Sequence, residues 1–209
     1  MATRGILRSV IPASFNNALV VRASGGPTVL KDLSNERVAM TMQDASRIDA
    51  AAVAVQVFVG GEHETQSIKN LNDLIDAGLD YGIPVLGVTA VGRDLVRDAR
   101  YLGLATRVIA EFGAQMVKTY YCDDFEQVTA GCPVPVIMAG GKKLPLLDAL
   151  TMARRAIDGG AAGVDMGRNI FQRTNPPAMI QAVSALVHED LSAADAAEFY
   201  RDLADGADD

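Results

Sequence analysis

The sequence has no tryptophan, few other aromatic residues and only two cysteines, Cys122 and Cys132. Two cysteines cannot build the disulfide framework of a small secreted protein, so we expect a reducing compartment, the cytoplasm. No apolar run is long enough to span a bilayer, and residues 1–5 are not followed by the apolar core of a secretory signal. These absences exclude disulfide-rich and membrane-spanning classes and predict a cytoplasmic protein.

Acidic side chains outnumber basic ones, which gives a formal net charge of −7. An acidic protein repels phosphate backbones and anionic lipids, so we expect neither nucleic acid nor a membrane as a partner. Hydrophobic residues make up 49% of the chain, which is enough for a sizeable core. A length of 209 residues then predicts one domain over residues 1–209.

Six short, nearly continuous apolar runs recur along the chain. They lack the alternation of apolar and polar residues that marks a half-exposed sheet, and they are typical of parallel strands covered on both faces. The runs cover residues 18–22, 52–59, 84–90, 115–121, 134–139 and 162–166.

Between these runs the apolar residues recur with helical spacing. The apolar stripes that we expect to face the core include Leu71, Leu74 and Leu79 in the first helix, Leu95, Val96, Leu102 and Leu104 in the second, and Met179 and Ile180 in a later one. Ser192 is placed to cap the last helix, which is more polar than the others. The predicted helices cover residues 67–81, 93–112, 145–158, 177–188 and 193–204.

Strands and helices that alternate about every thirty residues indicate either a βα barrel or an open, doubly wound sheet. No G-x-G-x-x-G follows the first strand, and the candidate functional residues lie at the ends of several strands, so we favour the barrel. A (β/α)8 barrel has eight strands, whereas this chain offers six full strands and a remnant in residues 2–8. The sequence therefore predicts a TIM (β/α)8-type barrel that is incomplete at its N-terminus.

Lys118 stands alone in the apolar strand at 115–121. Burial disfavours the ammonium form of lysine, and a neutral amine can attack a ketone and form a Schiff base that acts as an electron sink. The alternative is that Lys118 lies near the strand end and that its ammonium group reaches water.

Two glycine turns with basic residues follow the fifth and sixth strands. The first contains Gly140, Gly141, Lys142 and Lys143, and the second contains Gly167 and Arg168. Glycine lets backbone N–H groups approach an anion, a nearby helix N-terminus adds a favourable dipole, and Arg168 can clamp a phosphate. The loops after the last two strands of a barrel commonly bind phosphate, so we expect a phosphorylated substrate here. The alternative is a pair of ordinary turns with a solvated Arg168.

Arg22 and Gln56 are polar residues within apolar strands. Either they face the mouth of the barrel and support the active site, or they form buried hydrogen bonds that fix strand packing. Lys142 or Lys143 can keep Lys118 neutral by charge repulsion, and either can equally be a solvated loop residue. Asp165 can pair with a lysine or bind backbone.

The cysteines and histidines show no pattern typical of a site. Neither His63 nor His188 has an evident acidic partner, so a Cys/His nucleophilic pair at Cys122 is not expected, and we interpret Cys122 and Cys132 as structural. No spacing fits zinc, and no metal is expected.

Four segments together resemble the class I, Schiff-base aldolase family that includes deoxyribose-phosphate and archaeal fructose-bisphosphate aldolases. They are 118–121 (KTYY), 130–135 (AGCPVP), 139–143 (AGGKK) and 163–172 (GVDMGRNIFQ). Segments 3–8, 22–25 and 66–70 resemble the thiolase branch of that family, and the likeness extends over nearly the whole chain.

The resemblance implies a βα barrel in which Lys118 forms the Schiff base. It implies that the turns at Gly140–Gly141 and Gly167–Arg168 bind the substrate phosphate. For the thiolase branch it implies cleavage of a phosphorylated 2,4-dione, with coenzyme A as co-substrate and no bound cofactor, to give dihydroxyacetone phosphate and acetyl-CoA. Members of this type assemble into ring-shaped homo-oligomers, often of ten subunits.

Two departures from the family pattern keep alternatives open. The segment 88–92 (VTAVG) has no tyrosine where the fructose-bisphosphate branch places its acid. The Asp-His-Gly motif at the end of the family's first strand, which supplies acid and base groups, is also missing. Besides the thiolase, the alternatives are a class I aldolase acting on a sugar phosphate such as fructose bisphosphate, and an inactive, truncated phosphate-binding fragment.

Overall fold

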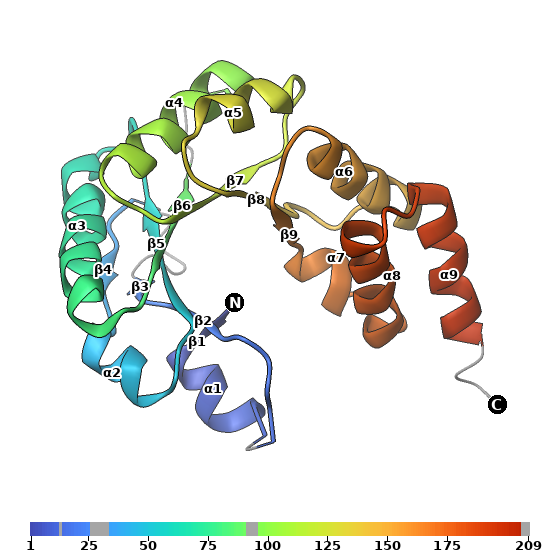
Figure 1. Cartoon of the computed structure of the whole chain (residues 1–209), viewed down its shortest axis with the longest axis horizontal. Coiled ribbons are helices and arrows are strands. Elements are labelled where there is room, and N and C mark those ends of the chain that lie inside the picture. The colour runs from blue at the N-terminus through green and yellow to red at the C-terminus, as the bar shows by residue number, and fades with distance from the viewer. Residues whose placement is uncertain (13, 26–33, 91–95, 206–209) are drawn as a thin grey trace.

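The structure is a computed structural model that describes residues 1–12, 14–25, 34–90 and 96–205. Its centre is a curled, seven-stranded parallel sheet with the strand order β1-β2-β5-β6-β7-β8-β9 (Figure 1). The strands are β1 (Ala2–Thr3), β2 (Val20–Arg22), β5 (Ala52–Val57), β6 (Val85–Thr89), β7 (Met116–Tyr120), β8 (Val136–Ala139) and β9 (Gly163–Asp165). The six predicted strands and the N-terminal remnant, β1, are thus confirmed, and β1 and β9 form the two edges of an open, barrel-like sheet.

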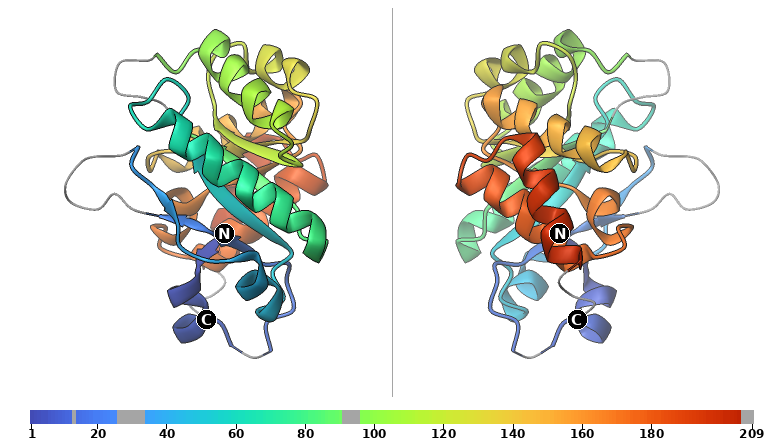
Figure 2. Two further views of the ribbon diagram at one scale, coloured as in Figure 1. Left: turned by 90° about the vertical axis from the view of Figure 1, so that its left-hand side faces the viewer. Right: turned by 90° about the vertical axis from the view of Figure 1, so that its right-hand side faces the viewer.

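Helices cover the convex outside of the sheet (Figure 1). Helix α3 packs on β5 and β6, as the side views also show, while α6, α8 and α9 pack on one another near the β9 edge (Figure 2). The helices are α1 (Arg4–Val10), α2 (Met42–Arg47), α3 (Glu64–Tyr81), α4 (Ala99–Glu111), α5 (Phe125–Gly131), α6 (Leu146–Asp158), α7 (Gly167–Phe171), α8 (Pro176–His188) and α9 (Ala193–Asp205). None of these helices in the described residues is both long and apolar enough to cross a membrane.

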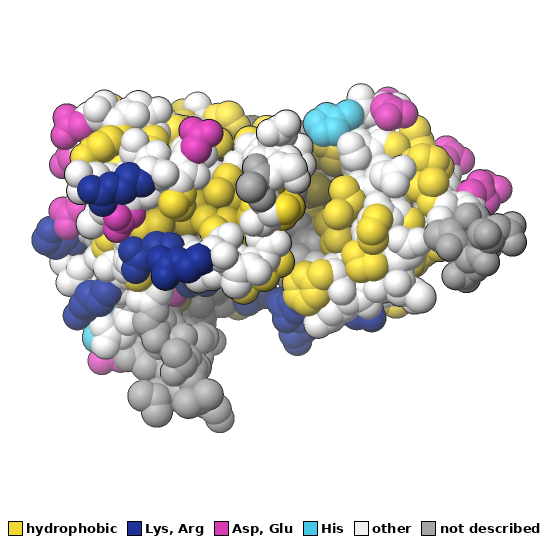
Figure 3. Space-filling view, turned by 90° about the horizontal axis from the view of Figure 1, so that it is seen from below, with side chains coloured by type: hydrophobic (Ala, Val, Ile, Leu, Met, Phe, Trp, Pro, Cys, Tyr) yellow, Lys and Arg dark blue, Asp and Glu magenta, His cyan; other side chains and the backbone are white. Residues whose placement is uncertain are grey.

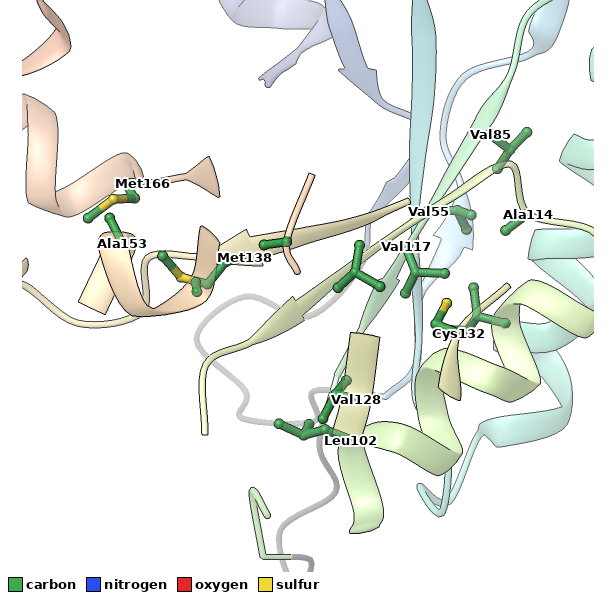
Figure 4. Close-up of a cluster of buried hydrophobic side chains, with 14 of the residues drawn as sticks. Val55, Val85, Leu102, Ala114, Val117, Val128, Cys132, Met138, Ala153 and Met166 are labelled. Atoms are coloured by element: carbon green, nitrogen blue, oxygen red, sulfur yellow. The ribbon is translucent and has the colours of Figure 1, made fainter. Parts of the chain in front are cut away.

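The main core lies between the outer face of the sheet and this layer of helices. Successive strand residues point to opposite faces, so alternate residues of each strand reach the core. Val55, Val117 and Met138 are such residues; they are fully buried and belong to one apolar cluster with Leu102 of α4 and Ala153 of α6, which lies near Met138 (Figure 4). The intervening residues face the concave inside of the sheet.

The strand register aligns the polar residues of the concave face. Gln56 of β5 pairs with Val88 of β6, Val88 pairs with Lys118 of β7, and Lys118 pairs with Ile137 of β8. Residues paired in this way in parallel strands project to the same face. Gln56 and Lys118 therefore share the concave face, with one strand between them.

Several local elements differ from the sequence prediction, and the short helices α2, α5 and α7 were not predicted. Residues 4–10 form the short helix α1 instead of a loop, and an antiparallel pair, β3 (Ser24–Gly25) and β4 (Arg37–Val38), was not predicted. The helix expected over 93–112 begins only at Ala99, because the Asp98 side chain caps it by accepting a hydrogen bond from the Tyr101 N–H at 2.8 Å. Residues 93–95 lie outside the described residues.

The predicted apolar stripes were partly wrong. Leu79, Val96, Leu104 and Ile180 are exposed, whereas Leu102 on the same helix as Leu104 is fully buried. Helices α3 and α4 pack on the sheet along one side, so Leu79 and Leu104 at the border of their apolar stripes are left in solvent, and Val96 precedes the start of α4. Leu95 lies outside the described residues.

We predict that Leu102→Ala lowers the free energy of unfolding by about 2–5 kcal/mol, because it empties a packed site between α4 and the sheet. The matched control is Leu104→Ala on the same helix, where the side chain is 57% exposed and the expected change stays within about 0.5 kcal/mol. Urea unfolding followed by circular dichroism measures both values. Equal losses in the two variants would contradict the assignment of the core to this face of α4.

Candidate active site

Lys118 lies in the middle of β7 and points to the concave face of the sheet. Its side chain is only 12% exposed, and its Nζ donates a hydrogen bond of 2.7 Å to Oδ2 of Asp165. Asp165 is the last residue of β9, and its carboxylate is 29% exposed. Of the two predicted alternatives for Asp165, pairing with a lysine is therefore confirmed.

This pair has the composition of a site for carbonyl chemistry. A lysine amine can add to a ketone, and a carboxylate within hydrogen-bonding distance can take up and return the protons that the addition releases. The expectation that Lys142 or Lys143 holds Lys118 neutral stays a prediction. Lys142 is exposed, and the Lys143 ammonium group donates to the carbonyl of Gln172 at 2.6 Å.

The open side of the curled sheet gives access to the concave face. Seen from below, the molecule shows hydrophobic side chains around a recess between the part that holds α1 to α3 and the part that holds α7 to α9 (Figure 3). The half-buried residues Lys118 and Asp165 belong to this concave face of the sheet.

The two glycine turns lie beside each other, as the sequence predicted, because they follow the paired strands β8 and β9. Gly140 donates its N–H to the carbonyl of Asp165 at 3.0 Å, and a Cβ at Gly140 would stand 2.7 Å from the Cα of Met166. Gly141 has a φ of +59°, in the left-handed region that favours glycine. The close approach of the two turns thus requires glycine at position 140, whereas glycine at position 141 is favoured by the left-handed backbone alone.

Asn169 holds the two turns together and was missed by the sequence analysis. Its buried amide donates to the carbonyls of Gly140 at 2.7 Å and Lys142 at 2.9 Å, and its Oδ1 accepts the N–H of Leu144 at 2.8 Å. All three bonds reach a loop more than twenty residues earlier in the chain. In the sequence Asn169 stands between Arg168 and Ile170, and this local pattern gives no signal that its side chain is buried.

Arg168 is exposed, and its guanidinium makes no hydrogen bond or ion pair with the described part of the chain. The helix that begins at Gly167 has only five residues, too few for the helix-dipole contribution that the sequence analysis invoked. Phosphate binding at these turns would thus depend on backbone N–H groups and on the Arg168 guanidinium.

Arg22 and Gln56 meet at the ends of β2 and β5. The Arg22 Nη2 donates to Oε1 of Gln56 at 2.7 Å and to Oε1 of Glu36, and Ser24 Oγ donates to the other Glu36 oxygen at 2.6 Å. Each of the two alternatives for these residues is therefore partly met. Arg22 and Gln56 lie on the concave side of the sheet, and they also form hydrogen bonds within the fold. Glu36 was missed, because nothing in its local sequence marks it as buried.

The described residues contain no group of three or more histidine, cysteine or acidic residues that could hold a metal ion. Both cysteines are buried and unbridged. Burial raises the pKa of the Cys122 thiol to about 11, and the carboxylates of Asp123, Asp98 and Asp124 add to the shift. A thiol of this kind is a poor nucleophile, which agrees with its interpretation as structural.

We predict that Cys122 reacts slowly with Ellman's reagent at pH 7, where a pKa of about 11 leaves roughly one thiol in ten thousand ionised. The rate should rise about tenfold per pH unit up to pH 10, because the thiolate is the reactive form. Single Cys132→Ala protein isolates the signal of Cys122, and the same protein in urea provides the control for an accessible thiol. Fast, stoichiometric labelling of the folded protein at pH 7 would contradict this description.

The chain is similar to known proteins over most of its length. The DeoC/LacD family aldolase profile matches residues 6–173. A Yersinia pseudotuberculosis protein named 3-hydroxy-5-phosphonooxypentane-2,4-dione thiolase is 59% identical over 201 residues, which cover 96% of this chain and 69% of that protein.

Solved aldolase structures share the fold at low sequence identity. The fructose-bisphosphate aldolase from Slackia heliotrinireducens is 18% identical and superposes with a TM-score of 0.86 over 96% of this chain and 71% of its own. An archaeal fructose-1,6-bisphosphate aldolase, described with its catalytic lysine covalently bound to a carbinolamine intermediate, is 22% identical with a TM-score of 0.77 over 97% and 75% of the two chains. The chain therefore belongs to the DeoC/LacD aldolase family and is an enzyme of the class I aldolase type.

Proposed function

We propose that the protein cleaves 3-hydroxy-5-phosphonooxypentane-2,4-dione with coenzyme A to give dihydroxyacetone phosphate and acetyl-CoA. The observation that carries the proposal is the half-buried Lys118–Asp165 pair, with both glycine turns at the ends of β8 and β9. The name of the 59% identical relatives specifies the substrate. Lys118 is the Schiff-base residue, and Gly140, Gly141, Gly167 and Arg168 form the phosphate site.

The order of the strands supports one direction for the proposed substrate. The phosphate group binds at the turns after β8 and β9, and the neighbouring C4 ketone then meets Lys118 on β7. The acyl end, which continues from C4 through C3 to C2, extends away from β8 toward β6 and β5. The polar group on that side of Lys118 is the one formed by Arg22 and Gln56.

In the proposed reaction, the Lys118 amine adds to C4 and water leaves, which forms an iminium ion. The coenzyme A thiol adds to the C2 carbonyl after losing its proton to a base, and the resulting oxyanion collapses. The C2–C3 bond breaks, C2 departs as acetyl-CoA, and the electron pair passes through C3 into the iminium to form an enamine. A proton returns to C3, and water then hydrolyses the iminium to dihydroxyacetone phosphate and free Lys118.

Asp165 is the group placed to carry protons at the lysine. Its Oδ2 already accepts a hydrogen bond from Lys118 Nζ, so it can take a proton when the amine adds to the ketone and return one when the adduct loses water. The iminium supplies the electron sink, and no metal is part of the proposal. We also propose that the protein is cytoplasmic and assembles into a homo-oligomer.

A class I aldolase reaction on a sugar phosphate uses the same lysine and the same phosphate site. The two functions differ in whether coenzyme A accepts an acyl group. The proposed thiolase consumes coenzyme A in step with the dione and forms a thioester. An aldolase releases an aldehyde and leaves coenzyme A unchanged. Measurement of thiol loss and thioester formation with each substrate separates them.

We predict that incubation with dihydroxyacetone phosphate followed by borohydride reduction attaches the ligand to Lys118, as peptide mass mapping would reveal. Lys118→Ala should abolish the adduct, because no other lysine among the described residues has the same partly buried position beside a carboxylate. Lys69→Ala is the control, since Lys69 is exposed on α3 and bonds only Asp73 at 2.6 Å. Absence of any adduct on folded wild-type protein would refute the Schiff-base proposal and favour a phosphate-binding fragment.

We predict that Arg168→Gln raises the concentration of dihydroxyacetone phosphate needed for half-maximal trapping by about tenfold, the typical value of a lost charged hydrogen bond. Trapping of unphosphorylated dihydroxyacetone should not change, since it lacks the group that Arg168 binds. The control is Arg155→Gln, which makes the same exchange at an exposed position on α6 and should leave the trapping of both ligands unchanged. An equal effect of Arg168→Gln on both ligands would rule out a phosphate contact.

A further inference from the structure

Glu36 is the one charged side chain among the fully buried polar residues of the described chain, with an exposed fraction of 1%. Each of its carboxylate oxygens accepts a hydrogen bond, one from Arg22 Nη2 and the other from Ser24 Oγ at 2.6 Å. Its backbone carbonyl accepts a further bond from the Asn70 amide at 3.0 Å. The carboxylate is thus held by two partners, and the Glu36 backbone is held by a third.

This arrangement holds the Arg22 side chain in one position. Its guanidinium is held by Glu36, by Gln56 Oε1 at 2.7 Å and by the carbonyl of Ser24, which accepts from Nε at 3.0 Å. The Arg22 side chain nevertheless stays 35% exposed. A buried ion pair rarely stabilises a fold more than apolar residues of the same size, because removing two charges from water is costly. An arginine fixed on one side and open on the other is suited to binding a ligand.

The open side of Arg22 lies on the concave face that carries Lys118. Gln56, which bonds Arg22, is in register with Val88 and through it with Lys118. Arg22, Ala54, Gln56 and Val88, together with Met1 and Val55, line a small cavity of about 30 Å3. A space of this size is about that of one water molecule or one carbonyl oxygen.

We propose that Arg22 binds the oxygen of the acyl carbonyl, C2, of the dione, and that Glu36 and Gln56 are positioning residues that hold the guanidinium for this task. This inference rests on the proposed function, since it takes Lys118 as the Schiff-base residue and the glycine turns as the phosphate site. When the thiol adds to C2, the carbonyl oxygen becomes an oxyanion, and a preorganised guanidinium stabilises that charge.

The dimensions of the sheet agree with this placement. Neighbouring strands lie about 4.8 Å apart, so β2, which carries Arg22 and lies three strands from β7, is about 14 Å from β7 at the backbone. Inward-pointing side chains converge in a curled sheet, and the long Lys118 and Arg22 side chains shorten the remaining gap. One substrate molecule can reach both Lys118 and Arg22, because C4 and the C2 carbonyl oxygen are three bonds apart and each group needs to approach only one of them.

The test compares two ligands that differ only in the acyl end. Wild-type protein and Arg22→Lys are incubated with increasing dione or dihydroxyacetone phosphate, and the Lys118 adduct is fixed with cyanoborohydride, which reduces iminium ions in preference to ketones. We expect Arg22→Lys to raise the half-saturating concentration of the dione by about tenfold, because an ammonium group cannot reproduce the guanidinium contacts. The value for dihydroxyacetone phosphate should stay within about twofold, because that ligand has no acyl end to contact Arg22.

Two further variants keep the result decisive. The double variant Arg22→Gln with Glu36→Gln leaves no unpaired buried charge. As with Arg22→Lys, we expect it to raise the half-saturating concentration of the dione and not that of dihydroxyacetone phosphate. Arg47→Lys makes the same exchange on the exposed face of α2 and should leave the half-saturating concentrations of both ligands unchanged. Trapping of dihydroxyacetone phosphate also reports that each variant is folded.

The outcomes separate this inference from the proposed function. If the wild type traps neither ligand, the proposed function fails and the inference fails with it. If Arg22→Lys loses both ligands equally, Arg22 only maintains the strand ends, and the inference is wrong while the Schiff-base proposal stands. Unchanged trapping of both ligands likewise overturns the inference, and selective loss of the dione supports it.

Discussion

The hydrogen bond between Lys118 and Asp165 joins two strands that are not neighbours. β8 lies between β7 and β9, so the two side chains can meet at 2.7 Å only because both point to the concave face of a curled sheet. The same curvature places the turns after β8 and β9 beside the lysine. A flat sheet with the same strand order would separate these groups, so the chemistry of the site depends on the curl.

The two faces of the sheet have different tasks. The outer face is packed with Val55, Val117 and Met138 against the helices and provides most of the apolar burial. The concave face can therefore carry Lys118, Asp165, Arg22 and Gln56, because the fold does not depend on that face for its main core. Alternation along each strand is the physical reason that one short segment serves both tasks.

Two buried polar side chains connect the loops to the strand ends. Asn169 bonds three backbone groups in the loop after β8, and Glu36 fixes Arg22 at the end of β2 and Ser24 of β3. A buried polar group that lost such partners would be strongly destabilising, so each network tolerates only one arrangement. These residues give the flanks of the concave site a defined shape, while Lys118 itself comes from a regular strand.

The sequence by itself determined the positions of the parallel strands and of most of the helices, and it singled out Lys118 as a candidate functional residue. Buried parallel strands leave a local signal of continuous apolar residues, and one lysine within such a run is conspicuous. Glycine turns at Gly140 and Gly167 were visible for the same local reason. Tertiary structure alone decided which partner Lys118 takes, 47 residues away, and that Glu36 and Asn169 are buried. It also decided that Leu104 is exposed and Leu102 is not, because both outcomes depend on contacts between segments far apart in the chain.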